Sequence, residues 1–444
     1  MPRVGAYRGV LGLVLLIGVA LLFSRHRRGI SWRTVLAALG VQVLFAVVVL
    51  RTTPGSDALE FLATQVETLI GYTTEGTSFV FGPLLDVGGS TGSIFALQVL
   101  PVIIFLGALV YLLYYLRVIQ YLTWAVGGAI AWLLRVSNLE GMYGATVIFL
   151  GQSEAPLMIA PYLSRLTRPQ IFAVVTSGFA AAAGSTLVGY ALLGAPLTYL
   201  LAATVMNAPA SLLMAKLMWP DSTPEDTGTD SETDTDTGDD AVDLQKPGDD
   251  DVDRSDDASA QHADVRQTRD TESVNAIHAI SRGARAGGQI AITVGALLIA
   301  FVALIGLANG VLSGIGSWFG VTDLTFQSVL GAALSPVAWL LGVPWSEAAQ
   351  AGTYIGEKTI LNEFVAFADF GPDVATLAPV TVVVVTFALA GFANFASIAI
   401  QIGTLGSLRP ELRSVVASVG LRALLAGSLA NLANAAIAGV VFAV

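Results

Sequence analysis

The sequence contains no cysteine and few charged residues. The missing cysteine excludes disulfides, thiol nucleophiles, iron–sulfur clusters and zinc sites with cysteine ligands. Only 12% of the 444 residues are charged, against about 25% in soluble domains, while 54% are hydrophobic. Long apolar runs recur along the whole chain, so the composition predicts an all-α polytopic membrane protein.

Histidine is almost as scarce as cysteine. The three histidines, His26, His262 and His278, all lie outside the apolar runs. A metal site or a proton relay built on histidine inside the membrane is therefore not expected.

Acidic residues are concentrated in one stretch between the two halves of the chain. The formal net charge is −11, but the stretch from Asp221 to Glu272 holds 19 of the 33 acidic residues and only four of the 22 basic ones. Residues 220–272 are rich in Asp, Thr, Gly and Ser and nearly free of aromatic residues. Because such a stretch cannot bury enough apolar surface to offset the entropy of ordering, we predict a disordered acidic insert.

Eight apolar segments are long enough to cross a bilayer, which takes roughly 20 residues. Two other segments, Asp57–Ile70 and the basic Ser273–Ala286, are amphipathic and are predicted to lie at the interface. Val118–Leu134 and Leu324–Leu341 are compatible with either a span or an interfacial helix. The predicted spans are Tyr7–Phe23, Val35–Leu50, Phe95–Leu116, Ile171–Leu193, Leu197–Trp219, Gln289–Ala308, Val374–Leu405 and Ser414–Val444.

Basic residues in the short loops predict the orientation in the membrane, because cytoplasmic loops carry an excess of Lys and Arg. The loop RHRRGISWR after the first span is therefore placed inside, and the N-terminus outside. The loops that contain Arg168 and Arg413 are placed inside as well. Counting spans then puts the acidic insert in the cytoplasm and the C-terminus outside, provided that two short hairpins turn back within the membrane.

Those two hairpins are predicted where polar residues separate apolar arms too short to span. The first, near residues 141–166, carries the motif GQSE, and the second, near residues 345–370, carries NEFVAF. Each is followed by a long apolar span with a polar interruption, GSTLVGY in one case and GFANFAS in the other. Paired interruptions of this kind predict re-entrant hairpins in an inverted-repeat transport domain, with a site at the interface between the repeats.

The repeated order of hairpin and interrupted span predicts that the chain is divided into four parts. Residues 1–94 form N-terminal spans and an interfacial helix of a scaffold, and residues 95–219 form the first transport repeat. After the insert at 220–272, residues 273–444 supply an interfacial helix, a scaffold span and the second transport repeat.

Glu154 and Glu363 are the carboxylates of the two hairpins. A charged side chain at the centre of a membrane costs at least about 2.5–3.5 kcal/mol, so such groups usually serve a partner, a pore or a substrate. The alternative for Glu154 is a loop at the water surface, or a cap on the helix that Pro156 begins, and Glu363 has a similar alternative. Lys358 lies one residue from Glu357 and five from Glu363, and is expected to form an ion pair at the hairpin mouth.

Asn394 and Ser397 lie three residues apart in GFANFAS, which places both side chains on one helix face. They are either ligand contacts or hydrogen bonds between membrane helices. With GQSE, they supply carboxylates, amides and hydroxyls but no cluster of basic residues. This chemistry suits a neutral ligand rich in hydroxyl and amide groups, whereas a phosphate would require Arg or Lys.

These motifs resemble those of the concentrative nucleoside transporter family. The stretches GQSEAPLMIAPYL, GFAAAAGSTLVGY, NAPASLLMAKLMWP, NEFVAF and GFANFASIAI occur in the family's order, and they cover most of the chain from Phe95 onward. The resemblance implies a homotrimer of eight-span protomers in the plasma membrane, with an elevator-like movement of the transport domain against the scaffold. It also implies a nucleoside and a coupling cation as partners, with no cofactor and no nucleic acid.

The resemblance assigns residues to the two parts of a nucleoside. The first hairpin faces the base, and the second hairpin binds the ribose together with the interrupted span that follows it. The base-facing positions are Gly151, Gln152, Ser153 and Glu154, with Thr186 beside the base. The ribose-binding positions are Glu363, Asn394 and Ser397, and Phe392 lines the pocket.

One departure from the family pattern concerns the coupling ion. Sodium-coupled members resemble one another in having an Asn four residues before the Gly of the first motif and a hydroxyl residue in the next span. Those positions here are Val147 and Ala181, which supply no side-chain oxygen for sodium. We therefore favour proton coupling through a protonatable glutamate, with a shifted sodium site built from backbone carbonyls as the alternative. The ion-coupling candidates are Glu154, Glu363, Val147, Leu150, Ala181 and Ala182.

The sequence thus predicts a cation-coupled importer of nucleosides that works by alternating access and is not an enzyme. One rival is a membrane-embedded hydrolase that uses Glu154 and Glu363 as acid and base. Against this alternative, the sequence offers no metal ligands, no nucleophile–base pair and no cytoplasmic catalytic domain. The other rival is a membrane scaffold or receptor whose acidic insert docks partners.

Overall fold

The fold is helical throughout the described part of the chain, which confirms the all-α prediction. A computed structural model describes residues 2–82, 84, 95–221, 266, 268–320 and 324–443, and no strand occurs among them. The predicted disordered insert falls mainly on residues 222–265, which lie outside the described residues.

Seven helical segments of the described chain are long and apolar enough to cross a membrane, or up to eight if the bent pair α13 and α14 counts as one span. Seven of the predicted spans coincide with these segments, while the predicted span 374–405 is divided into two short helices. The spanning helices are α1 (Pro2–Leu22), α2 (Trp32–Arg51), α4 with α5 (Phe95–Gln98 and Leu100–Tyr115), α8 with α9 (Arg168–Ala180 and Gly184–Leu192), α10 (Leu197–Met218), α12 (Ala276–Trp318) and α18 (Leu412–Ala443).

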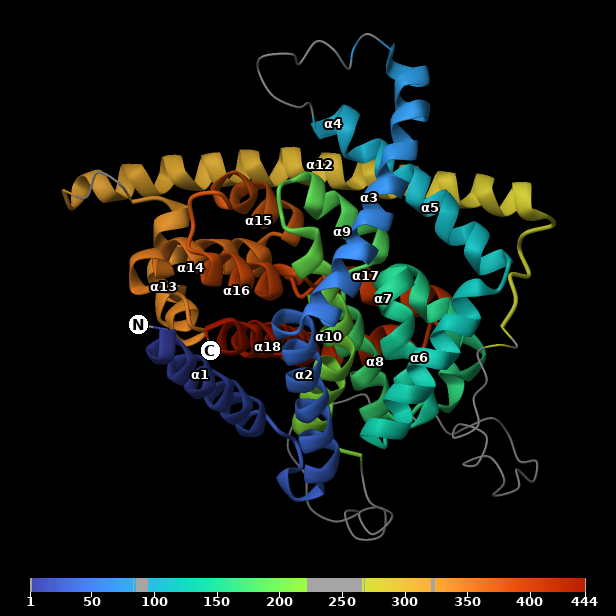
Figure 1. The fold of residues 1–444 in the computed structure, drawn as a ribbon, viewed down its shortest axis with the longest axis horizontal. Coiled ribbons are helices and arrows are strands. Elements are labelled where there is room, and N and C mark those ends of the chain that lie inside the picture. Colours follow the sequence, from blue (N-terminus) through green and yellow to red (C-terminus); the bar gives the residue numbers. More distant parts are fainter. Residues whose placement is uncertain are drawn as a thin grey trace.

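The helix α12 corrects one prediction. A separate interfacial helix at Ser273–Ala286 and a span at Gln289–Ala308 were expected, but both belong to one continuous helix of 43 residues. Only Gly287 and Gly288 separate the two segments, and glycine without proline weakens a helix without ending it. At 1.5 Å per residue the helix is about 65 Å long, twice the roughly 30 Å of a bilayer core. It runs along one edge of the molecule (Figure 1) and is long enough to cross a bilayer core even when strongly tilted.

The helices α5 and α12 touch backbone to backbone along their crossing. A Cβ on Gly283 would lie 2.5 Å from the carbonyl oxygen of Gly107, and a Cβ on Gly287 would lie 2.6 Å from that of Ile103. Small residues spaced by four let two membrane helices approach this closely and pack as one unit. Substitution of these glycines by any larger residue would force the pair apart.

Each predicted hairpin consists of two helical arms with a break between them. The first hairpin is α7 (Asn138–Ile159), which is interrupted at Gly151 and continues into a 3-10 turn at Ala160–Arg165. The second hairpin comprises α14 (Trp345–Ile360) and α15 (Glu363–Phe370). The preceding helix α13 (Phe326–Leu340) meets α14 at an angle of 115°.

Two helices are broken near their middle, where the sequence predicted polar interruptions. Residues 181–183 separate α8 from α9, and residues 390–394 separate α16 (Pro379–Leu389) from α17 (Phe395–Leu408). The two breaks meet, because the amide nitrogen of Phe392 donates a hydrogen bond of 3.0 Å to the carbonyl oxygen of Ala181. Backbone groups that a continuous helix would pair internally are thereby paired across the breaks.

The helix α18 passes through the centre of the molecule (Figure 1) and packs against α1, α8, α10, α16 and α17. It is rich in Ala and Gly, which lets neighbouring helices approach closely. Its two asparagines, Asn431 and Asn434, are fully buried. A central helix with buried amides is placed to hold the two breaks in register.

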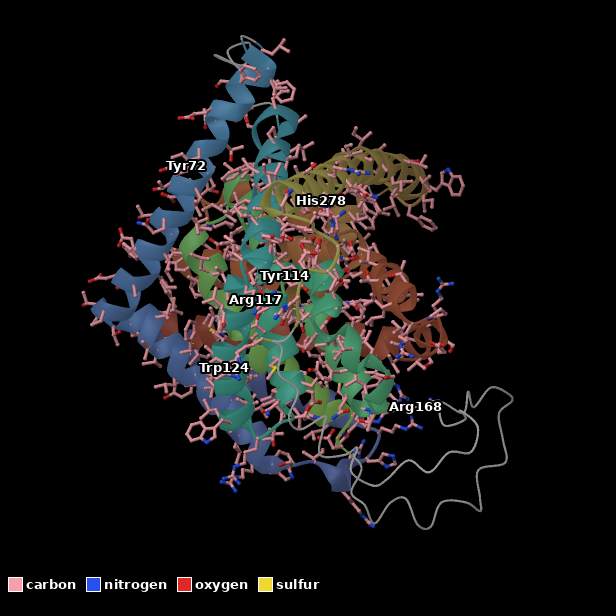
Figure 2. The ribbon with its side chains drawn as sticks, turned by 90° about the vertical axis from the view of Figure 1, so that its right-hand side faces the viewer. Tyr72, Tyr114, Arg117, Trp124, Arg168 and His278 are labelled. Atoms are coloured by element: carbon pink, nitrogen blue, oxygen red, sulfur yellow. The ribbon has the colours of Figure 1, made fainter. Side chains whose placement is uncertain are left out.

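The helix α3 (Thr53–Phe81) stands at the edge of the molecule, with Tyr72 on its exposed side (Figure 2). It is longer than the predicted amphipathic segment 57–70. The helix α6 spans Val118–Leu134, as the apolar segment suggested. That α3 lies at the membrane interface stays a prediction, and the choice between a span and an interfacial helix stays open for α6 and α13.

A buried ion pair joins α7 to α10 and carries a stability prediction. The Nζ of Lys216 lies 2.6 Å from Oε1 of Glu140, and both side chains are at most 6% exposed. Replacing Lys216 by Met leaves Glu140 buried without its partner, which should cost about 3–5 kcal/mol of the free energy of unfolding. We expect a clearly lower Tm for the detergent-solubilised variant, while Glu60→Gln on the exposed side of α3 should leave the Tm unchanged. Equal melting of the two variants would contradict the prediction.

Candidate functional site

A cavity of about 410 Å³ lies where the hairpin tips, the two helix breaks and α12 meet. Its volume is within the usual range for small-molecule sites, about 300–1,000 Å³. The structure brings all of the predicted substrate-binding residues to its wall. These are Gly151, Gln152, Ser153, Glu154, Thr186, Glu363, Phe392, Asn394 and Ser397.

The first hairpin tip depends on a glycine. Gly151 has a φ of 74°, a left-handed conformation that L side chains rarely adopt, and a Cβ there would lie 2.5 Å from the Cβ of Ala183. The turn points Gln152 into the cavity, where its Nε2 donates to Oγ of Ser397 at 3.0 Å. Nε2 of Gln401 donates to Oε1 of Gln152 at 3.4 Å. The tip is thus fixed against α17 by side-chain hydrogen bonds.

The second hairpin tip presents a carboxylate with two donors already in place. Oε1 of Glu363 accepts from the Tyr190 hydroxyl at 3.1 Å, and Oε2 accepts from Nδ2 of Asn394 at 2.8 Å. The Asn394 Oδ1 accepts from the amide nitrogen of Ser397 at 2.9 Å, which caps α17. The capping bond orients the amide of Asn394 toward Glu363. One carboxylate therefore links the second hairpin to both broken helices.

Three helix N-termini converge on the cavity. The helices α9, α15 and α17 begin at Gly184, Glu363 and Phe395, and residues in the first turn of each line the wall. Helix N-termini carry partial positive charge and free N–H donors, which favours the Glu363 carboxylate and the acceptor groups of a ligand. No Lys or Arg of the described residues lines the cavity. The site therefore offers dipoles and hydrogen bonds rather than full positive charge.

The helix α12 forms the wall opposite the hairpins, a contribution that the sequence alone did not predict. Gln289 and Thr293 lie one turn apart on this helix, and both line the cavity. Tyr190 and Gln401 were also missed, although each lies one helical turn after a predicted site residue, Thr186 in the first case and Ser397 in the second. The i to i+4 spacing could have found them.

Lys358 does not form the ion pair expected at the hairpin mouth. Its side chain is 2% exposed, and Nζ donates to the carbonyl oxygen of Ala388 at 3.2 Å and to Oδ1 of Asn431 at 2.8 Å. It is absent from the ion pairs of the described residues. The reason is geometric: the helix α14 turns Lys358 toward the break after α16 rather than along the hairpin axis.

The residues considered for a coupling ion lie beside the first break. Val147 and Ala181 are buried, and the Ala181 carbonyl already accepts the hydrogen bond from Phe392. A Cβ on Gly184 would lie 3.6 Å from the carbonyl oxygen of Phe149 and 3.9 Å from that of Ile148. Carbonyl oxygens of the first hairpin therefore face the break. No cluster of three His, Cys, Asp or Glu suited to a metal occurs in the described chain.

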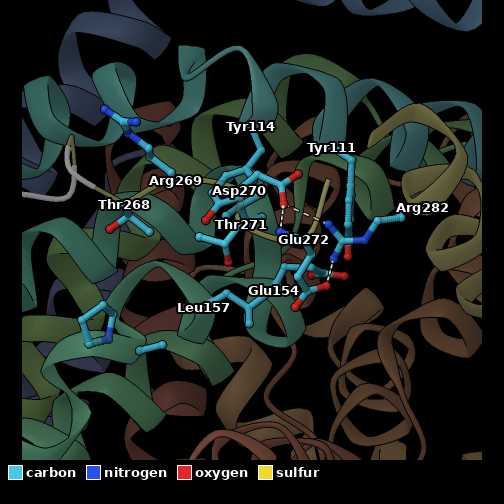
Figure 3. A pocket seen from close by; sticks show the side chains of 13 residues that line it. Tyr111, Tyr114, Glu154, Leu157, Thr268, Arg269, Asp270, Thr271, Glu272 and Arg282 are labelled. Atoms are coloured by element: carbon cyan, nitrogen blue, oxygen red, sulfur yellow. Dashed lines mark hydrogen bonds and ion pairs between the residues drawn. The ribbon is translucent and has the colours of Figure 1, made fainter. Parts of the chain in front are cut away.

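A second cavity, of about 460 Å³, lies on the other side of Glu154, which lines both cavities. Its wall includes Tyr111 and Tyr114 of α5 and the segment that leads into α12 (Figure 3). Two acidic residues of this segment bind Arg282 of α12: Oδ1 of Asp270 accepts from Nη1 of Arg282 at 3.0 Å, and Glu272 forms an ion pair with it. Glu154 thus has a cavity on either side of it.

We call residues 268–275 the strap, because this segment leads into α12 and its first residue, Thr268, is hydrogen-bonded to the first hairpin. Oγ1 of Thr268 donates to the carbonyl oxygen of Met158 in α7 at 3.3 Å, while Asp270 bonds to Arg282 of α12. Burial acts to raise the pKa of the Asp270 carboxyl, but hydrogen bonds from Ser273 and Glu272 and the Arg282 guanidinium outweigh it, so this pKa lies below its usual value. The Arg282 pair is therefore ionised at neutral pH.

Family models match almost the whole chain. Residues 199–439 match a model described as the C-terminus of a Na+ dependent nucleoside transporter, and residues 11–84 match the N-terminal model of the same family. Residues 96–197 match a model described as nucleoside recognition.

Curated relatives and solved structures agree with these matches. An uncharacterized transporter of Bacillus subtilis, YutK, is 46% identical over 97% of this chain and 98% of its own length. The nucleoside permease NupC of Helicobacter pylori is 38% identical over 97% of this chain and 96% of its own. The structure of CNTnw in an inward-facing substrate-bound state has a TM-score of 0.85 at 39% identity, covering 99% of this chain and 98% of that one. A CNTnw variant in an outward-facing state gives 0.86 at 40%, with the same coverage.

Proposed function

Since the chain belongs to the concentrative nucleoside transporter family, we propose that it imports nucleosides against their gradient in symport with a cation. It is a membrane nucleoside transporter that works by alternating access, and it is not an enzyme. Accumulation, the direction of transport and the identity of the ion are the proposed parts. In such a symporter, ion and nucleoside bind the same outward state cooperatively, so that the ion gradient drives uptake.

The observation that carries the proposal is the single cavity that gathers all of the predicted binding residues without a basic side chain. Its amides can donate to and accept from the edge of a base, which suits Gln152. Its carboxylate, amide and hydroxyl at Glu363, Asn394 and Ser397 suit the hydroxyls of a ribose. A ribose hydroxyl can bind Glu363 beside the present donors, because a carboxylate has about four acceptor sites and Tyr190 and Asn394 use one on each oxygen.

We further propose that the coupling ion is a proton, because Val147 and Ala181 offer no side-chain oxygen to sodium. Glu154, which lies between two cavities, and Glu363 are the groups that would carry it. Sodium is the second candidate. The description of the matching family and the carbonyl oxygens of Ile148 and Phe149 beside Gly184 favour it.

Uptake into proteoliposomes tests the function and the ion together. Labelled uridine and adenosine would be offered with a proton gradient and a sodium gradient imposed separately. Accumulation with protons alone supports proton coupling, and accumulation with sodium alone supports a site of backbone carbonyls. Absence of uptake for both nucleosides under both gradients would overturn the proposed function. Recovery of the label as unchanged nucleoside would separate transport from hydrolysis.

The wall formed by α12 gives a further prediction. Gln289 lines the cavity and makes no side-chain hydrogen bond within the described chain, so we expect it to hydrogen-bond the nucleoside. Loss of one such bond, worth about 0.5–1.5 kcal/mol, should raise the KM of Gln289→Ala about 2- to 13-fold with little change in maximal rate. The control is Ile292→Ala, which lies on the exposed side of the same helix. Indistinguishable KM values for the two variants would remove Gln289 from the site.

We also propose the homotrimer and the elevator-like movement that the family resemblance implies. The long helix α12 supports an assembly, since only 17% of its most apolar window is buried within one protomer. In the elevator-like movement the hairpins and the paired breaks would travel together against the α5–α12 pair. A mass measurement of the detergent-solubilised protein tests the trimer: a monomer would contradict it.

Placement of both termini outside and the insert in the cytoplasm is likewise proposed.

A further inference from the structure

Lys358 is a buried lysine that does not line the substrate cavity. Direct binding of a nucleoside therefore does not explain its presence. A buried ammonium is costly unless it is paired and fully hydrogen-bonded. Lys358 lies in α14 with its side chain 2% exposed, and its recorded acceptors are a backbone carbonyl and an amide oxygen rather than a carboxylate. The compensating negative potential must therefore come from these neutral acceptors together with the Glu363 carboxylate, which attracts the ammonium without forming an ion pair with it.

Part of that potential comes from two helix C-termini. The helices α8 and α16 end at Ala180 and Leu389, immediately before the two breaks. The carbonyl oxygens at a helix C-terminus lack helical partners and carry partial negative charge. In transporters with broken helices, such ends commonly coordinate the transported cation. Lys358 Nζ binds one of these carbonyls directly, that of Ala388.

Asn431 of α18 connects Lys358 to the other helix end. Its Oδ1 accepts from Lys358 at 2.8 Å, and its Nδ2 donates to the carbonyl oxygen of Ala180 at 2.7 Å. Its Nδ2 also lies 3.1 Å from Oδ1 of Asn207, whose own Nδ2 donates to the carbonyl oxygen of Ala390 at 2.6 Å. One ammonium and two amides thus satisfy carbonyls at both breaks.

The two breaks meet this network at close range. A Cβ on Gly391 would lie 2.3 Å from the carbonyl oxygen of Ala180 and 2.5 Å from Oδ1 of Asn431. No side chain can be inserted there, so the breaks are held backbone to backbone. The cavity residues Phe392 and Asn394 follow directly in the chain, and Ala183 supports Gly151 on the other break. The network therefore lies directly next to the segments that carry the binding side chains.

We propose that Lys358 is a tethered cation that joins the C-terminal ends of the two broken helices and thereby positions the nucleoside-binding residues. It occupies the kind of place that a bound ion takes in other broken-helix sites, but it is covalently part of the second hairpin. Lys358 is thus a positioning residue that needs its charge, because a neutral side chain of similar length cannot neutralise two helix ends. The proposal rests on the proposed nucleoside site.

The test separates the charge of residue 358 from its size. The affinity of purified variants for uridine and adenosine is measured by calorimetric titration. Lys358→Met keeps the length and removes the charge, and it should weaken binding at least tenfold. Lys358→Arg keeps the charge and should bind more tightly than the Met variant despite its larger volume. The matched control is Lys216→Met, which removes another buried lysine far along α10 and should lower the Tm without changing nucleoside affinity.

A rescue experiment tells whether the site needs the positive charge of Lys358 or only the volume of its side chain. In Lys358→Ala, added n-propylammonium should restore part of the lost affinity, whereas 1-propanol of the same size should not. Equal rescue by both compounds, or a Met variant that binds like the unchanged protein, would overturn the proposal. If the Met and Ala variants do not fold, the Arg variant decides: retained binding supports the tethered cation, and absent binding refutes it. Failure of the unchanged protein to bind either nucleoside would instead refute the proposed function.

Discussion

Glu363→Gln is expected to lower nucleoside affinity about 10- to 150-fold, the loss that corresponds to a hydrogen bond with a charged acceptor, about 1.5–3 kcal/mol. The carboxylate accepts from the Tyr190 hydroxyl and from Nδ2 of Asn394. An amide at this position can accept through only one of its two terminal atoms, so it cannot accept from both Tyr190 and Asn394 as the carboxylate does. The variant therefore loses an acceptor for ribose hydroxyls and also the link between the second hairpin and one broken helix.

The measurement is the dissociation constant of uridine for the purified variant, together with its initial uptake rate in proteoliposomes. Asp369→Asn is the matched control, because Asp369 lies on the same helix, α15, but is exposed and does not line the cavity. It should bind and transport like the unchanged protein. A Glu363→Gln variant with unaltered affinity would show that the ribose is held elsewhere.

Glu154→Gln is expected to abolish concentrative uptake while leaving the protein folded. Glu154 lines the substrate cavity and the cavity beside the strap, so it can meet an ion from one side and the nucleoside from the other. The amide keeps the shape of the side chain but neither binds a proton nor supplies a negative charge to sodium. Coupling should be lost under either ion, whereas the binding surface contributed by Gln152 and Ser397 is left intact.

Two assays on the same proteoliposomes separate coupling from binding. Accumulation under an ion gradient should fall to the level of simple equilibration. Exchange of internal unlabelled uridine for external labelled uridine, with equal ion concentrations on both sides, should continue. Accumulation like that of the unchanged protein would return GQSE to the status of a loop at the water surface, and loss of exchange as well would make Glu154 a substrate ligand rather than a coupling group.

The breaks in the helices were predictable from sequence, because local chemistry determines them. Gly151 is needed for a left-handed turn, and Asn362 and Asn394 are capping residues that begin α15 and α17. Such signals act within a few residues and can be read directly. The convergence of these breaks on one cavity followed from the paired arrangement of hairpins and interrupted spans, which the structure reproduces.

Other features depended on packing between distant segments and could not be read from local patterns. Lys358 looked like half of an ion pair because carboxylates are its neighbours in sequence, but its acceptors come from residues 30 and 73 positions away. The unbroken course of α12 is another case. The basic residues before Gly287 suggested a surface helix, yet its glycines pack against α5 and hold one continuous rod. Its contribution of Gln289 to the site followed from that course.

The strap has a consequence for the distance over which any part of this transporter can travel. One end is hydrogen-bonded to the first hairpin through Thr268, and the other enters α12 at Asn275. Six residues lie between these points, and the seven steps from Thr268 to Asn275 extend to at most about 25 Å when fully stretched. As long as both attachments hold, the strap limits how far the first hairpin can move relative to α12. The length of a peptide, counted in residues, would then set the mechanical range of the transport cycle.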